Sequence, residues 1–276
     1  MSIIFEHTQK NYEEDGIVSI GKSDSKICRF CRKSGKTFEK RAHSIPEFLG
    51  NKTVFTLDEC DDCNTFFGQK IEPELKKFIG PSVFHNLKGK KGWPISEVKG
   101  NIKINSTDQH RLIEIKSSEN FKPEKYEFTI KGKKFSCLKV YKGLVKILLS
   151  IMPSEYLSEF DTTSEWLMTG RDFEKICHVP WVLFGQQPPD FRHANLMDIC
   201  LIRNQSEKGV VYQMTANFNS IKIILPFSPI SKAKFRIGEV FDEGTEYKRY
   251  LFEWIDFSKS YTRKDFNFSV DLSSIK

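Results

Sequence analysis

Two Cys-x-x-Cys pairs in the first quarter of this 276-residue chain constrain its fold more than any other feature. The first pair is Cys28 and Cys31, and the second is Cys60 and Cys63. Two residues between paired cysteines allow both sulfur atoms to reach one tetrahedral ion, and four soft thiolates select Zn²⁺ over hard cations. We therefore predict a structural zinc site. Because four protein ligands close such a site to water, the zinc is expected to stabilise the fold and not to react.

The remaining bulk features favour a cytoplasmic protein. Seven cysteines are an odd number, which argues against a disulfide framework, and Cys137, Cys177 and Cys200 read as small buried apolar residues. Residues 1–16 are too polar and acidic for a signal peptide, and no apolar run is long enough to span a bilayer. We expect a cytoplasmic location and no membrane contact.

The stretch between the two cysteine pairs is too long for a simple zinc ribbon. It has 28 residues, whereas such ribbons have roughly 15–20. The insert contains His43 before an Ile-Pro dipeptide, and then a short strand over residues 54–57. Asn64 follows the second pair and precedes apolar residues at helical spacing over residues 67–78. The predicted order is cysteine pair, strand, His43, loop, strand, cysteine pair, Asn64 and helix.

At these residues the chain resembles the HNH (ββα-metal) endonuclease family, in the subgroup with a four-cysteine zinc site. The resemblance rests on CRFC (residues 28–31), AHSIPEFLGN (42–51) and CDDCNTFFGQKIE (60–72). It implies a nuclease that cuts DNA, with His43 as the general base and Asn64 as a ligand of a catalytic Mg²⁺ or Mn²⁺ ion. Histidine has the pKa that a base needs near neutral pH, and an amide oxygen suits a hard cation. Similar proteins occur in prokaryotic restriction, mobile elements and phage defence, which implies such a setting here.

One position departs from the family pattern. Many members carry Asp, Glu or His just before the general base as a second metal ligand, and this chain has Ala42. Glu72, eight residues after Asn64, is our preferred substitute, and Glu39 and Glu47 are weaker candidates. Alternatively, the ion has few protein ligands. Simpler interpretations also stay open: a histidine that serves only a loop, an asparagine that caps the helix, and a solvated glutamate before a helix-breaking proline.

The sequence after residue 80 indicates a second region. Glycine, proline and lysine residues concentrate over 80–94, so we predict a zinc-stapled nuclease domain over 1–85 and a larger domain over 86–276. A helix is expected over 140–151 and a second helical piece over 157–168. Strands are expected over 102–104, 112–115, 126–130, 199–202, 210–214, 221–226, 235–240 and 250–254. The predicted fold class is α+β: a small ββα-metal module followed by a mixed domain with a mostly antiparallel sheet.

The charge distribution is compatible with DNA binding outside the cysteine-rich part. The net charge is +7, and residues 1–80 have as many basic as acidic residues, so the surplus lies beyond them. Weak candidates for contacts with phosphates and bases are Lys88, Lys90, Lys91 and Trp93, although an exposed linker explains them equally well. The second region is expected to recognise DNA, a partner protein or a regulatory ligand. Two rival hypotheses remain: a non-catalytic zinc-ribbon DNA-binding protein, and an effector subunit that is active only with a partner or ligand.

Overall fold

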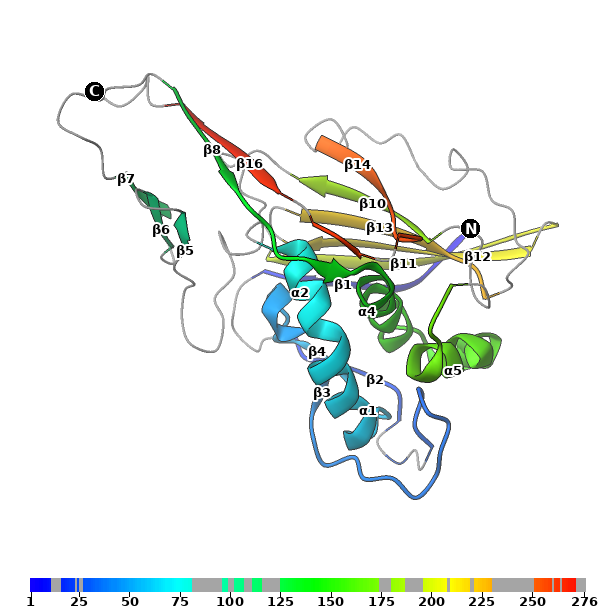
Figure 1. Cartoon of the computed structure of the whole chain (residues 1–276). Coiled ribbons are helices and arrows are strands. Elements are labelled where there is room, and N and C mark those ends of the chain that lie inside the picture. The colour runs from blue at the N-terminus through cyan, green and yellow to red at the C-terminus, as the bar shows by residue number, and fades with distance from the viewer. Residues whose placement is uncertain are drawn as a thin grey trace.

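The computed structural model (Figure 1) describes most of the chain. The described residues are 1–10, 16–22, 24, 27–80, 96–98, 102–106, 111–115, 125–173, 180–186, 196–207, 209–218, 221–229, 251–259, 261–263 and 265–271. The predicted domain boundary at residue 85 and the predicted strand over 235–240 lie outside these residues.

The largest sheet in the described part of the chain has six strands in the order β1-β11-β12-β13-β10-β14, and all neighbouring strands are antiparallel. Its strands are β1 (Ser2–Gln9), β10 (Trp181–Gln186), β11 (Met197–Ser206), β12 (Gly209–Phe218), β13 (Ile221–Phe227) and β14 (Leu251–Asp256). Buried and half-buried residues alternate along most of β12, as they do in a strand with one face on a core, whereas β13 is buried throughout. The predicted α+β class with a mostly antiparallel sheet is confirmed.

Smaller sheets also occur in the described part of the chain. A three-stranded antiparallel sheet contains β5 (Ser96–Val98), β6 (Ile102–Ser106) and β7 (Arg111–Ile115). Two strand pairs join distant parts of the chain: β8 (Lys125–Ile130) with β16 (Phe266–Asp271), and β9 (Phe135–Ser136) with β15 (Tyr261–Thr262).

The sequence pattern does not predict two strands of the large sheet. The first is β1. From the sequence, residues 1–25 are expected to form a polar segment with one short strand over 17–20, and that strand corresponds to β2 (Val18–Ile20). β1 lies at the edge of the sheet, so most of its side chains stay partly or fully exposed and its composition can be polar. The second is β10, a short apolar run between the flanking prolines Pro180 and Pro188, which favour loops.

Helices lie on one side of this sheet (Figure 1). The central one is α4 (Cys137–Ser150), which confirms the predicted helix over 140–151 and begins earlier because the Ser136 hydroxyl accepts a hydrogen bond from the Lys139 N–H at 3.4 Å. A 3-10 helix (Ser154–Phe160) and α5 (Asp161–Thr169) follow it. In the described part of the chain, no helix combines the length and apolar character that crossing a membrane requires.

One apolar core runs from the cysteine-rich segment to the sheet. Phe78, on the helix after the second cysteine pair, contacts the ring of Phe184 on β10 with 5.3 Å between centroids. On α4, Gly143 permits a close approach to the same helix, because a Cβ atom there would lie 3.2 Å from Leu75 Cδ2. Residues on both sides of the predicted domain boundary therefore share a single cluster of buried side chains.

Candidate active site

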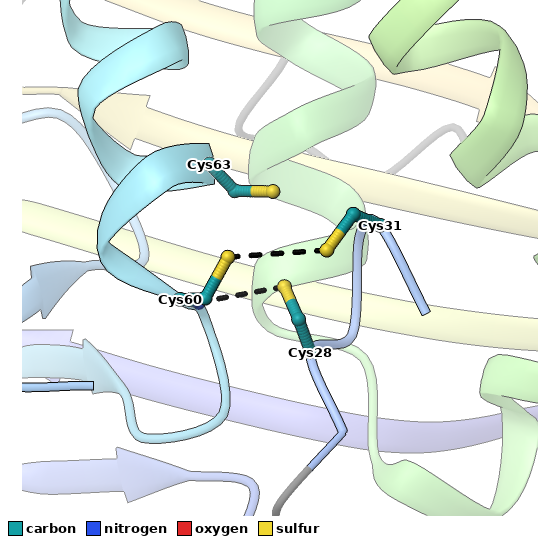
Figure 2. A group of neighbouring side chains, drawn as sticks. All are labelled: Cys28, Cys31, Cys60 and Cys63. Carbon is teal, nitrogen blue, oxygen red and sulfur yellow. Dashed lines mark hydrogen bonds between the residues drawn. The ribbon is translucent and has the colours of Figure 1, made fainter. Parts of the chain in front are cut away.

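Four cysteine sulfurs from two separate parts of the chain converge on one point (Figure 2). Cys28 and Cys31 lie in the turn after β2, while Cys60 caps α1 (Asp61–Phe66) and Cys63 lies in its first turn. All four Sγ atoms lie within 4.8 Å of one another, and those of Cys31 and Cys60 are 3.9 Å apart. A tetrahedral zinc ion with Zn–S bonds of about 2.3 Å separates its sulfurs by roughly 3.8 Å. The predicted ligands are thus brought together at distances that fit structural zinc.

The pKa shifts of Cys28, Cys60 and Cys63 also fit a bound cation. A hydrogen bond from Cys63 lowers the pKa of the Cys28 thiol to about 5, and the Cys60 N–H also bonds to Cys28 Sγ, at 3.4 Å. Burial raises the pKa of Cys60 to about 11, and the interaction with Cys28 raises the pKa of Cys63. One thiolate therefore opposes ionisation of its neighbours, so four thiolates need a central cation.

The segment between the cysteine pairs forms the predicted hairpin. β3 (Ala42–His43) pairs antiparallel with β4 (Val54–Thr56), with Ala42 opposite Thr56 and His43 opposite Phe55. β2 adds to the other side of β4 in parallel, so β3 is an edge strand. Helix α1 then begins directly after Cys60. The predicted order of strand, His43, loop, strand and helix is confirmed.

His43 is half-buried at the end of β3, where several contacts limit its movement. Its ring packs on that of Phe55, with 4.8 Å between centroids, and the Arg41 guanidinium carbon lies 3.4 Å from the centroid of the same Phe55 ring. Its main-chain carbonyl accepts a hydrogen bond from Lys146 Nζ at 2.9 Å. The backbone and ring of the predicted base are thus both held, and Ala42 beside it is buried.

Asn51 is a structural residue of this site to which the sequence alone assigned no role. Its side-chain amide donates to the carbonyls of Ile45 at 2.8 Å and Val54 at 2.9 Å. Its Oδ1 accepts from the N–H groups of Thr53 at 3.1 Å and Val54 at 2.9 Å. One fully buried side chain therefore fixes the loop between β3 and β4, which follows His43. A Gly-Asn dipeptide between two short strands is the signal that indicates such a loop.

The N-terminal strand holds the same loop from the sheet. Gln9, the last residue of β1, donates from Nε2 to the Gly50 carbonyl at 2.9 Å. Its Oε1 accepts from the Lys52 N–H at 2.9 Å and from the Thr53 hydroxyl at 3.0 Å. The loop is thus attached to the large sheet.

Asn64 is half-buried in α1 and does not cap it, because the N-cap is Cys60. The helix continues through a π-helical turn (Phe67–Ile71) into α2 (Glu72–Ile79). At about 3.6 residues per turn, an unbroken α-helix would place Asn64 and Glu72 roughly 80° apart. A π-turn takes up one extra residue, so the two positions differ by about two whole turns and share a face. Pro73 does not break the helix: the widened turn lies at the carbonyls that its ring would otherwise meet.

Glu72 is half-buried, and burial raises the pKa of its carboxyl group, an effect opposed by the charge of Lys146. The two weaker candidates differ from it. Glu39 is exposed, and the carboxylate of Glu47 pairs with Lys52 Nζ at 2.5 Å. Glu72 is therefore the one of the three whose charge is poorly solvated and would gain most from a nearby cation.

Glu59 is an almost fully buried acid to which the sequence alone assigned no role. It precedes Cys60, and burial raises the pKa of its carboxyl group to about 7, although Lys146 opposes the shift. Its Oε2 lies 3.4 Å from Lys146 Nζ, and both side chains are almost fully buried. No sequence signal separates this residue from the more accessible acids Asp61 and Asp62, because its burial depends on α4.

Other predicted positions lie apart from this site or outside the described residues. Lys88, Lys90, Lys91, Trp93 and Cys177 lie outside the described residues. Cys137 is buried at the start of α4, as expected, while Cys200 on β11 is only half-buried.

Comparison with known proteins finds a family match for the segment that contains the hairpin, the cysteines and the helix. Residues 28–79 match the family model described as HNH endonuclease. The match begins at the first cysteine of the cluster, ends at the last residue of α2, and covers under a fifth of the chain. No curated protein and no solved structure matches the chain. Residues 28–79 are therefore similar to an HNH endonuclease domain, and the zinc-type cysteine cluster, the hairpin and the helix all lie within the matched segment.

Proposed function

We propose that this protein is a metal-dependent endonuclease that hydrolyses DNA phosphodiester bonds, with His43 as its general base. The observation that carries the proposal is the ββα arrangement within the family match: His43 ends β3, and the helix that holds Asn64 and Glu72 follows β4. An HNH nuclease domain implies a nucleic acid as substrate.

In the proposed reaction the chain supplies a base and ion ligands. The imidazole of His43 takes a proton from a water molecule while that oxygen bonds to phosphorus, and the bond from phosphorus to the leaving sugar oxygen breaks. Asn64 offers a neutral amide oxygen, and Glu72 offers a carboxylate whose raised pKa a cation would lower. When bound, Mg²⁺ or Mn²⁺ would stabilise the charge on the phosphate and the leaving oxygen. The Cys28, Cys31, Cys60 and Cys63 site would hold Zn²⁺ and take no part in the reaction.

The first rival is a zinc-ribbon protein that binds DNA without cutting it. Ala42 favours it, because the alanine side chain cannot bind a metal and is buried at 1% exposure. We prefer the nuclease because the chain still has an acid, Glu72, at a position that faces the same side of the helix as Asn64.

We assign target recognition or regulation to the region beyond residue 85, through DNA, a partner protein or a ligand. The excess of basic residues there supports contact with DNA. Four thiols arranged for a metal suit a reducing compartment, which supports a cytoplasmic location. A role in prokaryotic restriction or phage defence is supported only by the resemblance to the family.

The direct test is incubation of the purified full chain with supercoiled plasmid and a panel of divalent ions. We expect nicked or linear DNA with Mg²⁺ or Mn²⁺ and none with excess chelator. Asn64→Ala should raise the Mg²⁺ concentration for half-maximal cutting by about tenfold or more, and Glu72→Gln should act in the same direction. Binding of DNA without cutting by any ion would favour the zinc-ribbon rival. Cutting that begins only when a partner protein or ligand is added would favour the effector subunit.

A further inference from the structure

The strongest unexplained feature of the described residues is a lysine buried outside the matched segment. Lys146 lies on α4, and its side chain is only 2% exposed. A buried ammonium group is costly unless charged or polar groups surround it. Its partners therefore indicate why the chain keeps a lysine at this position.

Within the part of the chain that the structure describes, the ammonium group of Lys146 contacts residues of the 28–79 segment. Nζ donates to the His43 carbonyl at 2.9 Å and lies 3.4 Å from Glu59 Oε2. The rings of Phe30 and Phe67 have their centroids 6.0 and 5.8 Å from it, and its charge also acts on Glu72. A helix far along the chain thus completes the environment of the candidate base.

The hydrogen bond from Lys146 Nζ to the His43 carbonyl lies at the open edge of β3, where a neighbouring strand would otherwise bond. β3 is only two residues long and has β4 on one side. The N–H of Ser44 bonds to the Val54 carbonyl at 3.1 Å, and main-chain groups of successive residues alternate sides in a ladder. The His43 carbonyl therefore faces away from β4, where a third strand would bond to it. Lys146 takes that place.

We propose that Lys146 is a positioning residue of the nuclease site: its ammonium group fixes the main chain of His43 and so the direction of the imidazole. The inference rests on the proposed function of His43. It also implies that α4 is part of the working nuclease, although the family match ends before it. Lys146 itself does not touch the reacting atoms.

A second lysine on the same helix provides a matched control. Lys142, one turn earlier, is also buried, and its Nζ donates to the carbonyls of Leu167 at 3.0 Å and Gly170 at 2.7 Å. These carbonyls lie at the end of α5, outside residues 28–79. Lys142→Met therefore measures the cost of losing a buried lysine from α4 without removing a contact to His43.

The decisive comparison is between Glu59→Gln and the double variant Lys146→Met with Glu59→Gln. Lys146→Met alone would leave the Glu59 carboxylate buried without its cation, which endangers folding. The double variant removes both charges, and the single variant keeps the donor to the His43 carbonyl. Each full-length variant is tested for zinc content, thermal unfolding, kcat and KM with plasmid and Mg²⁺, and the carbon-13 shift of the His43 carbonyl.

We expect the double variant to fold and to bind zinc. Its kcat should be roughly a hundredfold lower than that of Glu59→Gln, with little change in KM, because misplacement of a catalytic group by about 1 Å has an effect of this size. Its His43 carbonyl shift should move upfield, as loss of a hydrogen bond requires, while Lys142→Met keeps the wild-type shift and kcat. Equal kcat values or an unchanged carbonyl shift in a folded double variant would overturn the inference and leave the proposed function intact. A wild-type chain that fails to cut DNA with every divalent ion in the panel would overturn the proposed function, and this inference with it.

Discussion

The matched segment and the six-stranded sheet are held together in different ways. In the sheet, β11 and β12 pair over ten residues, from Met197 opposite Phe218 to Ser206 opposite Gly209, so many hydrogen bonds share the stabilisation. In the matched segment, β3 has two residues and β4 has three. A few buried polar residues and the cysteine cluster stabilise it instead.

Arg29, inside the first cysteine pair, shows how concentrated these constraints are. Its Nε pairs with Asp58 Oδ1 at 2.5 Å, and Nη1 donates to the carbonyls of Leu149 and Ser150 at 2.9 Å each. One buried guanidinium thus links the end of α4 to Asp58, which lies between β4 and the second cysteine pair. Single substitutions should therefore damage the matched segment far more than the sheet.

Removal of a zinc ligand should have the largest effect. Cys60→Ser is expected to lose zinc and all cutting and to unfold the matched segment, because structural zinc contributes on the order of 10 kcal/mol to folding in small domains. Cys200→Ser, in the sheet and half-buried, should keep zinc and cutting. Metal analysis and thermal unfolding of both variants measure this, and a Cys60→Ser chain with wild-type zinc would contradict the assignment.

The next largest effect should be on activity alone. His43→Ala is expected to reduce cutting by about 10²–10⁴-fold, the usual contribution of a general base, while zinc and fold persist. His7→Ala on β1 removes a 2.8 Å contact with the Thr53 hydroxyl and should cost only about 1 kcal/mol of stability, with cutting retained. Plasmid cleavage with Mg²⁺ compares the two, and equal rates for wild type and His43→Ala would refute the role of His43.

Asn51→Ala should give an intermediate loss. It removes the hydrogen bonds of the Asn51 side chain to the carbonyls of Ile45 and Val54 and to two N–H groups, which should cost about 3 kcal/mol. Gln213→Ala on β12 removes a 3.4 Å contact with the Thr215 hydroxyl and should cost less than about 0.5 kcal/mol. Urea unfolding measures both free energies, and similar losses would show that the two regions do not differ as described.

The smallest effects should come from two glycines. Gly143→Ala places a Cβ 3.2 Å from Leu75 Cδ2 where α4 meets α2, so we expect a loss of about 1 kcal/mol. Gly68 is exposed within the π-turn, where a Cβ would meet no atom within 4 Å, so Gly68→Ala should raise stability by about 0.5 kcal/mol. Thermal unfolding gives the sign of each change, and a stabilising Gly143→Ala would contradict the tight helix contact.

Part of this molecule follows from local sequence. The cysteine spacing, the strand and helix periodicity and the order of elements around His43 predict the zinc cluster, the hairpin and the helix of Asn64. The predicted helix over 140–151 and several strands of the sheet also follow, because apolar periodicity is a local property. The edge strand β1 does not, since most of its side chains are partly or fully exposed and its composition is mixed.

The tertiary structure alone decided which polar residues are buried and what they contact. No pattern near residue 146 distinguishes Lys146 from the exposed lysines of the chain, and none separates Glu59 from the acids beside it. Their roles arise because α4 packs against a segment far earlier in the chain, and long-range packing sets both the desolvation and the partners of a charge. Sequence spacing identifies the four candidate zinc ligands, whereas only packing determines how the candidate base His43 is held.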